Sequence, residues 1–365
     1  MKLVCEKDRL KVRSTGAMSS KQMAGIIGML ESSAVIFRYD MGRRRDAGRR
    51  LKFGTVQMAT ILLFMEAKKL TFEGLREMAG KRGGQVVLKN LGMPVGPDGR
   101  YVLPSDGWLS EFRNHAYPEI RAELEAEIRR AVMERYEGVP KVITVDSTPL
   151  EASRYSEWAD FNPHYRIRMG KAHIVMVNGV PIASVITNGN AGDNPGLLRL
   201  LGCFDGTRLR DARFLSDGGY ASHESYLGVF RATGLVMSSN TGSNGRIHAD
   251  AEWRNVVRRY NRLSRFEGFV PAKRATPGFV LRFLAAHGEA ELAGWALRNL
   301  DIHRPEAVRA ADAKARHVCE TVHRAMKRWV DLDVRGLWRR YAGVRCCFRI
   351  LVCTLLCLAF RAYGC

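Results

Sequence analysis

The amino-acid sequence predicts an α/β protein, with short strands in the middle of a 365-residue chain and helices on both sides of them. Two observations predict the strands. Residues 142–145 form an apolar, mostly β-branched run, and two further apolar runs are joined by Asn178-Gly179, a strong signal for a tight hairpin. Helices are predicted at residues 53–70, where apolar residues recur at helical spacing, and at 306–330. The length suits two or more domains, since a domain typically has about 100–200 residues.

The balance of charges points to a polyanionic partner. The chain has 58 Lys and Arg against 37 Asp and Glu, a formal net charge of +21, so nucleic acid is the first partner to expect. A membrane surface is the competing anion, but the basic residues spread through every region instead of forming one block. The apolar run 350–360 is shorter than the roughly 20 residues that span a bilayer, and no signal peptide is recognisable. We therefore expect a cytoplasmic protein without membrane contact.

Five of the eight cysteines lie in the last twenty residues and form no Cys-x-x-Cys pair. This pattern differs from the spacings of zinc sites and of disulfide frameworks. It predicts buried thiols in a reducing compartment, on a C-terminal core helix.

The N-terminal region, residues 1–105, is predicted to be helical. A basic run that includes Arg43, Arg44 and Arg45 precedes the helix expected at 53–70, and a second short helix is expected at 72–79. A helix pair beside a basic run suits a helix-turn-helix that binds DNA phosphates, although such a pair can equally be a packing unit. Abundant Gly and Pro at residues 83–106 then predict a loop and a domain boundary.

The first strand predicted after the boundary carries a candidate catalytic carboxylate. A short helix is expected at residues 108–115 and a strongly charged helix at 118–136, and the apolar run 142–145 follows directly. Asp146 comes next and is expected to end the strand, where a carboxylate is held rigidly at the rim of a sheet. The alternative is a polar residue that starts a turn.

A second carboxylate follows another predicted strand. After the hairpin, residues 213–216 form a brief apolar run that ends at Asp217, and Gly218-Gly219 come next. These glycines would let a ligand or another backbone approach closely. A helix at 222–232, a strand at 235–239 and a loop at 240–245 complete this region, 106–245.

Residues 246–305 combine arginines with aromatic residues, in an expected helical insertion. Arg258 and Arg259 suit phosphate contacts, and Trp253 or Trp295 could stack on an unpaired base. The alternative is a helical subdomain with a solvated basic face and both Trp side chains in its core.

The long helix expected in region 306–365 presents Arg316, Glu320 and Lys327 on one face, because offsets of four and seven residues differ by only ~40° and ~20° around a helix. The alternative is an ordinary ion-pair face. Together with Asp146 and Asp217, Glu320 makes three carboxylates, which are ligands for hard divalent cations. Two cations about 3.5–4 Å apart would support an in-line phosphoryl transfer on a nucleic-acid backbone.

At these residues the chain resembles the Asp-Asp-Glu transposases of prokaryotic insertion sequences. The first family motif is similar to Val-Asp-Ser-Thr at Asp146, and the second to Ser-Asp-Gly-Gly-Tyr at Asp217. One branch has the spacing Tyr, two residues, Arg, three residues, Glu, six residues, Lys. Arg316, Glu320 and Lys327 fit it, but Ala313 takes the Tyr position, so the branch is less certain than the family. The stretches around three further residues also resemble family blocks: Asp106, Lys171 and Asp193. The resemblance extends from about residue 71 to the C-terminus.

The resemblance implies a ribonuclease-H-like mixed sheet flanked by helices, which is completed by the C-terminal helices. It implies two Mg²⁺ ions, for which Mn²⁺ could substitute, held by Asp146, Asp217 and Glu320, with phosphate contacts from Arg316, Lys327 and Lys171. The expected partners are double-stranded DNA, as terminal repeats and target, and a second copy of the chain in a homodimer on DNA, in the nucleoid of a prokaryotic cell. The insertion is β-rich in the best-known branch, whereas 246–305 is predicted to be helical.

Two alternatives remain on the same core. One is a resolving nuclease that lacks strand transfer. The other is a DNA-binding protein that has lost catalysis, which the presence of all three carboxylates disfavours. A phosphatase is discounted because Thr148 stands where such enzymes usually have a second Asp.

Overall fold

A computed structural model describes residues 20–47, 52–152, 156, 159–204, 209, 211–262, 290–330, 332 and 339–362. The chain divides into two compact units. The first comprises residues 1–132, 152–157 and 323–365, and the second comprises 133–151 and 158–322. Residues 106–132 and 323–365 belong to the first unit, and the expected domain boundaries after residues 105, 245 and 305 stay a prediction.

The second unit is built on a six-stranded sheet with the order β2-β3-β1-β5-β6, in which β4 also pairs with β3. The strands are β1 (Lys141–Glu151), β2 (Asp160–Asn162), β3 (Ile167–Val177), β4 (Val180–Asn188), β5 (Ala212–Asp217) and β6 (Met237–Asn240). β1, β5 and β6 are parallel to one another, whereas β3 is antiparallel to β1, β2 and β4. The predicted mixed α/β class is confirmed, and the arrangement is compatible with a ribonuclease-H-like fold.

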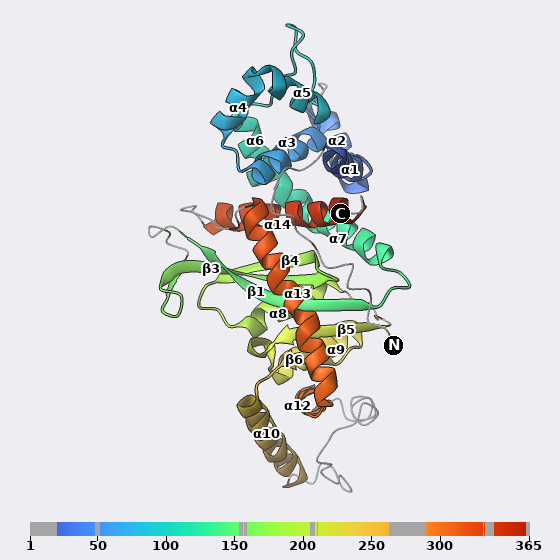
Figure 1. The fold of residues 1–365 in the computed structure, drawn as a ribbon, viewed down its shortest axis with the longest axis vertical. Helices are drawn as coiled ribbons and strands as arrows, with labels where there is room; N and C mark the ends of the chain where they lie inside the picture. The colour runs from blue at the N-terminus through green and yellow to red at the C-terminus, as the bar shows by residue number, and fades with distance from the viewer. Residues whose placement is uncertain are drawn as a thin grey trace. The chain divides into compact units, whose positions relative to one another are not determined.

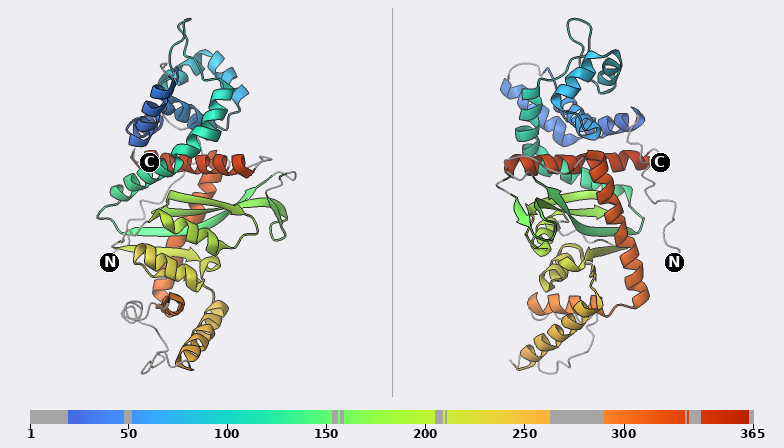
Figure 2. Two further views of the ribbon diagram at one scale, coloured as in Figure 1. Left: turned by 180° about the vertical axis from the view of Figure 1, so that it is seen from behind. Right: turned by 60° about the vertical axis from the view of Figure 1, so that its left-hand side comes forward.

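Helices cover both faces of this sheet (Figures 1 and 2). Residues 306–322 of α13 (Glu306–Val330) cross one face, and α8 (Asp193–Leu200) and α9 (His223–Thr233) pack on the other. α12 (Ala290–Ile302) packs against α9 and α10 (Ser243–Arg262). Strand residues on both faces, such as Val145 and Leu215, are therefore buried.

The predicted hairpin is confirmed. β3 and β4 are joined by Asn178-Gly179 alone, with φ angles of 50° and 78°. Two consecutive positive φ values characterise the two-residue turn that suits the twist of a hairpin, and Asn and Gly adopt them most readily. This local chemistry sets the register of β4 against β3 next to the turn.

The expectation that Asp146 ends its strand is wrong. β1 continues to Glu151 because β3 pairs with it over that whole length, whereas β5 pairs with β1 only as far as Thr144. Pro149 is tolerated inside the strand because the edge facing β5 is already unpaired there, so no ladder hydrogen bond is lost on that side.

The first unit is helical. Its helices are α1 (Ser20–Glu31), α2 (Ala34–Ala47), α3 (Thr55–Lys68), α4 (Phe72–Gly80), α5 (Arg82–Asn90), α6 (Asp106–Glu111), a π-helical turn (Phe112–Ala116), α7 (Tyr117–Arg135) and α14 (Arg339–Ala362). The predicted burial of the C-terminal thiols is confirmed for Cys346, Cys347, Cys353 and Cys357, which are free and buried in α14. None of the described helices is long and apolar enough to cross a membrane.

The loop expected at residues 83–106 is wrong in its first part, because α5 occupies Arg82–Asn90. One of the glycines that suggested a loop, Gly84, serves a close helix crossing instead. A Cβ at Gly84 would lie 1.8 Å from the Met78 carbonyl oxygen, so only glycine lets α5 begin directly against α4. Gly92, at φ 69°, follows the helix end, where a positive φ is common.

Candidate active site

Asp146 and Asp217 occupy equivalent positions on neighbouring parallel strands. The β1–β5 ladder ends at the pair Thr144–Leu215, and each Asp lies two residues beyond its member of that pair. Because side chains alternate between the faces of a strand, both carboxylates project from the face that carries Thr144 and Leu215. Paired strands are ~4.8 Å apart, so the two carboxylates leave the sheet from neighbouring strands, two residues beyond the end of the ladder.

Burial dominates the electrostatics of Asp146. Its side chain is 15% exposed, and burial raises the pKa of the carboxyl to about 6. The negative charges of Asp217 and Glu320 act in the same direction. The backbone N–H of Ser147, which donates to Oδ1 at 2.8 Å, and the Arg316 guanidinium oppose this shift in pKa. The effects of Asp217 and Glu320 on this pKa indicate that both carboxylates lie within electrostatic range of Asp146.

Asp217 is the exposed member of the pair. Its Oδ1 accepts a hydrogen bond of 2.8 Å from Gly218 N and thereby caps the 3₁₀ turn Gly218–Tyr220. A Cβ at Gly219 would lie 2.5 Å from Asp193 Oδ2, so the glycine admits this carboxylate behind the turn. The sequence predicted a close approach at these glycines, and Asp193 is the group that makes it.

Glu320 and Arg316 face the strand carboxylates from α13. Arg316 lies between the acidic groups, with Nη1 at 3.7 Å from Asp146 Oδ2 and Nη2 at 3.7 Å from Glu320 Oε1. Glu320 Oε2 is also 2.9 Å from Nδ1 of the exposed His317. Helix α13 therefore presents a cation to the sheet, with the third carboxylate beside it.

The donor set of these three residues suits a divalent cation, because carboxylate oxygens are the ligands that Mg²⁺ and Mn²⁺ prefer. Asp146 and Asp217 place two like charges on one face, and a cation would relieve their repulsion. However, within the described part of the chain no three His, Cys, Asp or Glu residues are arranged to hold a single ion. Arg316 occupies the space between Asp146 and Glu320, so the convergence of all three on one metal site stays a prediction.

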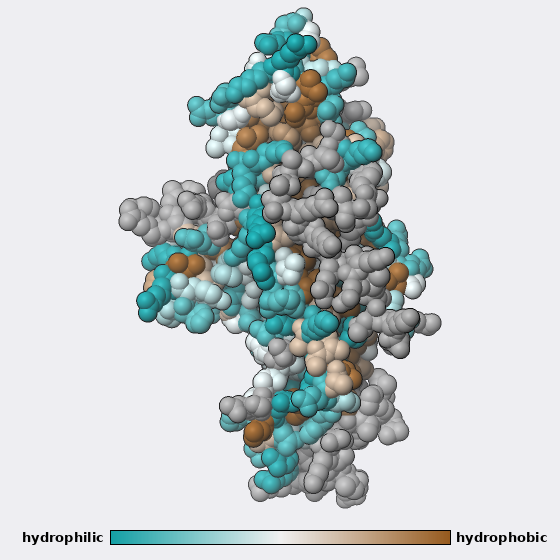
Figure 3. Space-filling view, in the orientation of Figure 1, coloured by the Kyte–Doolittle hydropathy of each residue, from teal (hydrophilic) through white to brown (hydrophobic). Residues whose placement is uncertain are grey.

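The other predicted phosphate ligands have diverse surroundings. Lys171 Nζ lies 3.1 Å from Asp193 Oδ1, and the Lys171 side chain is 17% exposed. The Asp193 carboxylate therefore already compensates the charge of Lys171. Arg258 is exposed on α10, over which hydrophilic residues cover much of the described surface in Figure 3. Lys327 is partly exposed in the part of α13 that belongs to the first unit. The remaining side chains lie outside the described residues: Arg43, Arg44, Arg45 and Arg259.

Both tryptophans proposed for base stacking are packed within the protein. Trp253 is 2% exposed on α10, which packs against α12. Trp295 stacks on the His223 ring, with the ring centroids 4.8 Å apart and an angle of 12° between the ring planes. The Arg298 guanidinium lies 5.3 Å from the centroid of the Trp295 ring. These positions favour the alternative of a helical core, and a stacking role stays a prediction.

Sequence reasoning missed a buried polar chain on the other face of the sheet. His173 Nδ1 lies 3.0 Å from the Tyr220 hydroxyl, and His173 Nε2 lies 2.9 Å from Thr187 Oγ1. Tyr220 also hydrogen-bonds to Ser147, the neighbour of Asp146, and its pKa is raised by burial. The signal was available, since His173 and Tyr220 belong to the two motif blocks Lys-Ala-His and Ser-Asp-Gly-Gly-Tyr.

His173 should make the fold acid-sensitive. Burial lowers the pKa of His173 to about 4, whereas a histidine in an unfolded chain has a pKa near 6.5. The unfolded chain therefore binds more protons, and stability that is complete above pH 6.5 is lost as the pH falls toward 4. At pH 5 the loss from this residue is roughly 2 kcal/mol.

Urea unfolding at pH 7 and pH 5 tests this expectation. The His173→Gln variant should show a difference between the two pH values that is smaller by roughly 2 kcal/mol than in the wild type. His164→Gln, at an exposed position of the same unit, is the matched control and should behave as the wild type does. An unchanged difference in His173→Gln would mean that the histidine is not held neutral.

Comparison with known proteins gives one family. A family model described as transposase DDE domain matches residues 137–357, more than half of the chain and all three carboxylates. No curated protein and no solved structure matches the chain.

Proposed function

The chain belongs to the transposase DDE domain family, and from this premise we propose that it cleaves DNA at the ends of a mobile element and transfers the freed 3′ ends into target DNA. Membership implies a transposase that acts on DNA, and such enzymes generally use divalent metal ions. We further propose that it acts as a homodimer on DNA, associated with the nucleoid of a prokaryotic cell.

One observation carries the proposal. Two carboxylates stand at equivalent positions on neighbouring parallel strands and share a face, and α13 sets Arg316 and Glu320 against that face. Asp146 and Asp217 would hold Mg²⁺, with Glu320 as a third ligand. When bound, two such ions would supply activation of the attacking oxygen and stabilisation of the leaving oxygen in an in-line displacement. The raised pKa of Asp146 supports this role, because the carboxylate is only poorly stabilised by the protein alone.

Arg316 would bind and orient the scissile phosphate, and Lys327 would contact a phosphate of the DNA backbone. In the first step the oxygen of a water molecule bonds to phosphorus, and the P–O bond to the 3′ oxygen breaks, so that the strand ends in a free 3′-hydroxyl. In the second step this hydroxyl attacks a target phosphodiester and loses its proton, and the target strand leaves through its own 3′ oxygen. Arg316 is well placed for charge-assisted contacts to phosphate once a cation compensates Asp146.

The test uses duplex DNA that carries the repeats flanking the gene, together with a target plasmid, with and without Mg²⁺. The proposal expects Mg²⁺-dependent nicks at the repeat ends and covalent joining to the plasmid. Cleavage without joining would favour the resolving nuclease. Binding without cleavage would favour a DNA-binding protein without catalysis.

The first unit offers a surface for sequence reading, and we propose that α5 lies on the DNA. Residues 52–105 contain eight Lys and Arg against four Asp and Glu, and α5 itself has no acidic residue. Arg82, Val86 and Lys89 are exposed at spacings of three and four, which places them on one face. An exposed basic face on the second of two crossing helices resembles the recognition helix of a helix-turn-helix.

A short arm is docked beside this helix. Residues 94–102 turn back on themselves through the Val95–Tyr101 bridge and a 2.9 Å hydrogen bond from Val102 N to Pro94 O. The Gln85 side chain holds the arm on α5, since its Oε1 accepts from Tyr101 N at 2.7 Å. Arg100 at the exposed tip could then reach phosphates beside the groove that α5 enters.

Replacement of Arg82 and Lys89 by Gln should lower affinity for the repeat DNA by at least about tenfold at low salt. The slope of log K against log salt should fall by about one for each phosphate that the protein no longer neutralises. Fluorescence anisotropy over a salt series measures both. Arg38→Gln, which removes an exposed charge on α2 that pairs with Glu123, is the control. An unchanged salt slope in the double variant would remove α5 from the DNA interface.

A further inference from the structure

A cavity of about 280 Å³ lies in the second unit, beside the carboxylates. The ends of β5 and β6, the residues just before α10, and the first turns of α13 line it. Its volume equals that of about nine water molecules at ~30 Å³ each, which is ample for a phosphate group with part of its sugar. Ser216 is the neighbour of Asp217, and Arg316 contacts Asp146, so the cavity adjoins the proposed catalytic groups.

One polar group on its wall has no hydrogen-bond partner among the described residues. Arg316 Nε is buried without one. A buried polar group without a partner costs roughly 1–3 kcal/mol, so this group is better explained as waiting for a ligand than as packing. It can only donate a hydrogen bond, which selects a ligand with acceptor oxygens.

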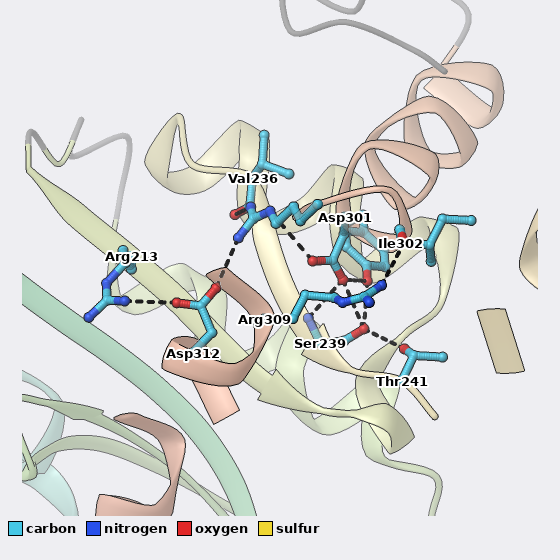
Figure 4. A network of polar contacts seen from close by, with 10 residues as sticks. Arg213, Val236, Ser239, Thr241, Asp301, Ile302, Arg309 and Asp312 are labelled. Carbon is cyan, nitrogen blue, oxygen red and sulfur yellow. Dashed lines mark hydrogen bonds and ion pairs between the residues drawn. The ribbon is translucent and has the colours of Figure 1, made fainter. Parts of the chain in front are cut away.

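The wall also carries positive charge that the described residues leave uncompensated. Arg309 donates to the neutral carbonyl oxygen of Ile302 at 3.1 Å, as Figure 4 shows, and makes no ion pair with a described residue. Arg246 likewise has no ion-pair partner in the described part of the chain. The first turn of α13 and the start of α10 add the partial positive charge of helix N-termini.

The acidic residues of the cavity do not cancel this charge. Asp312 is already bound by two arginines outside the lining, with Arg213 Nη1 at 2.8 Å and Arg304 Nη1 at 3.3 Å (Figure 4). Glu306 is exposed at the start of α13. Asp301 does not line the cavity, but its Oδ2 accepts from Ser239 N at 2.9 Å and fixes the β6 wall. The site is therefore rigid, basic and rich in donors.

Ala313 also lines the cavity. It is the residue that takes the Tyr position in the spacing of Arg316, Glu320 and Lys327. A large side chain at this position would project into the cavity and fill part of it. The cavity therefore depends on the small side chain of Ala313.

We propose that this cavity binds a phosphodiester of the DNA strand next to the cleaved bond, with Arg246 and Arg309 as ligands beyond the DDE carboxylates. This inference rests on the proposed function for its substrate, DNA. The bound phosphodiester would fix the register of the strand, so that the scissile phosphate lies over Asp146 and Asp217.

Binding can be tested apart from catalysis by calorimetry without divalent cations, with a 5′-phosphorylated thymidine dinucleotide and inorganic phosphate as probes. Arg309→Gln and Arg246→Gln should each bind the dinucleotide at least tenfold more weakly. The cavity-filling Ala313→Leu should weaken it as well. Arg231→Gln, an equal loss of charge at an exposed position on α9, should bind like the wild type.

The register is tested on repeat DNA in which single phosphates near the cleavage point are replaced by neutral methylphosphonates. One position should slow cleavage by the wild type, and the same position should have little effect on Arg309→Gln or Arg246→Gln. Full sensitivity of both variants at every position, or dinucleotide binding equal to the wild type, overturns the proposal. So does inorganic phosphate binding as tightly as the dinucleotide, since the site would then serve the free anion. Loss of dinucleotide binding in the variants, combined with a wild type that never cleaves DNA, would refute the proposed function and leave the phosphate site standing.

Discussion

Asp217→Asn is expected to lower DNA cleavage by a factor on the order of 10³ or more, while duplex binding stays within about twofold. The change removes the charge of a proposed metal ligand, and metal-ion catalysis contributes several kcal/mol, at ~1.4 kcal/mol per factor of ten. It keeps the shape of the side chain, and the Asn oxygen can still accept from Gly218 N, so the turn Gly218–Tyr220 should persist. Cleavage is measured in single-turnover reactions with Mg²⁺, and binding by anisotropy.

Asp211→Asn is the matched control, because it makes the same change at an exposed residue just before β5. Its φ of 53° is readily adopted by Asn, and it should cleave at the wild-type rate. Cleavage by Asp217→Asn at the wild-type rate would show that the second carboxylate of the site has been misassigned.

Glu66→Ala is expected to lower the free energy of unfolding by about 3–5 kcal/mol. Glu66 on α3 and Arg349 on α14 form an ion pair of 2.7 Å in which both side chains are less than 10% exposed, and Arg345 lies 3.3 Å from the same carboxylate. Loss of the acid would leave the Arg349 charge buried without compensation, and such losses cost that much. Urea denaturation measures the change.

Two variants distinguish this mechanism from a general loss of packing. Glu123→Ala removes one partner of the exposed pair with Arg38, and a loss below about 1 kcal/mol is expected. Replacement of both Glu66 and Arg349 by Met should be much less destabilising than Glu66→Ala, because it leaves no unpaired charge. A double variant as unstable as the single one would show that packing, and not charge, holds α14 against α3.

Much of the fold follows from local patterns, because these depend only on neighbours along the chain. Asn178-Gly179 predicts its turn from the φ values the two residues tolerate, and the structure confirms it. Gly83 and Gly84 led to the wrong prediction of a loop, because a glycine was taken as a sign of backbone freedom. Gly84 is instead required by its close approach to Met78, which only the packing of α5 on α4 creates.

The sequence by itself determined the acidic and basic residues from which a catalytic site could be built, and their motif spacing was enough to predict the family that the family model confirms. Only the tertiary structure decided the neighbours of those residues. It extended β1 beyond Asp146 because β3 continues to pair there, set Arg316 between two carboxylates, compensated Lys171 with Asp193, and opened a basic cavity beside Ser216. Charge compensation and burial depend on segments far apart in the chain, and no spacing along the sequence encodes which of them will meet.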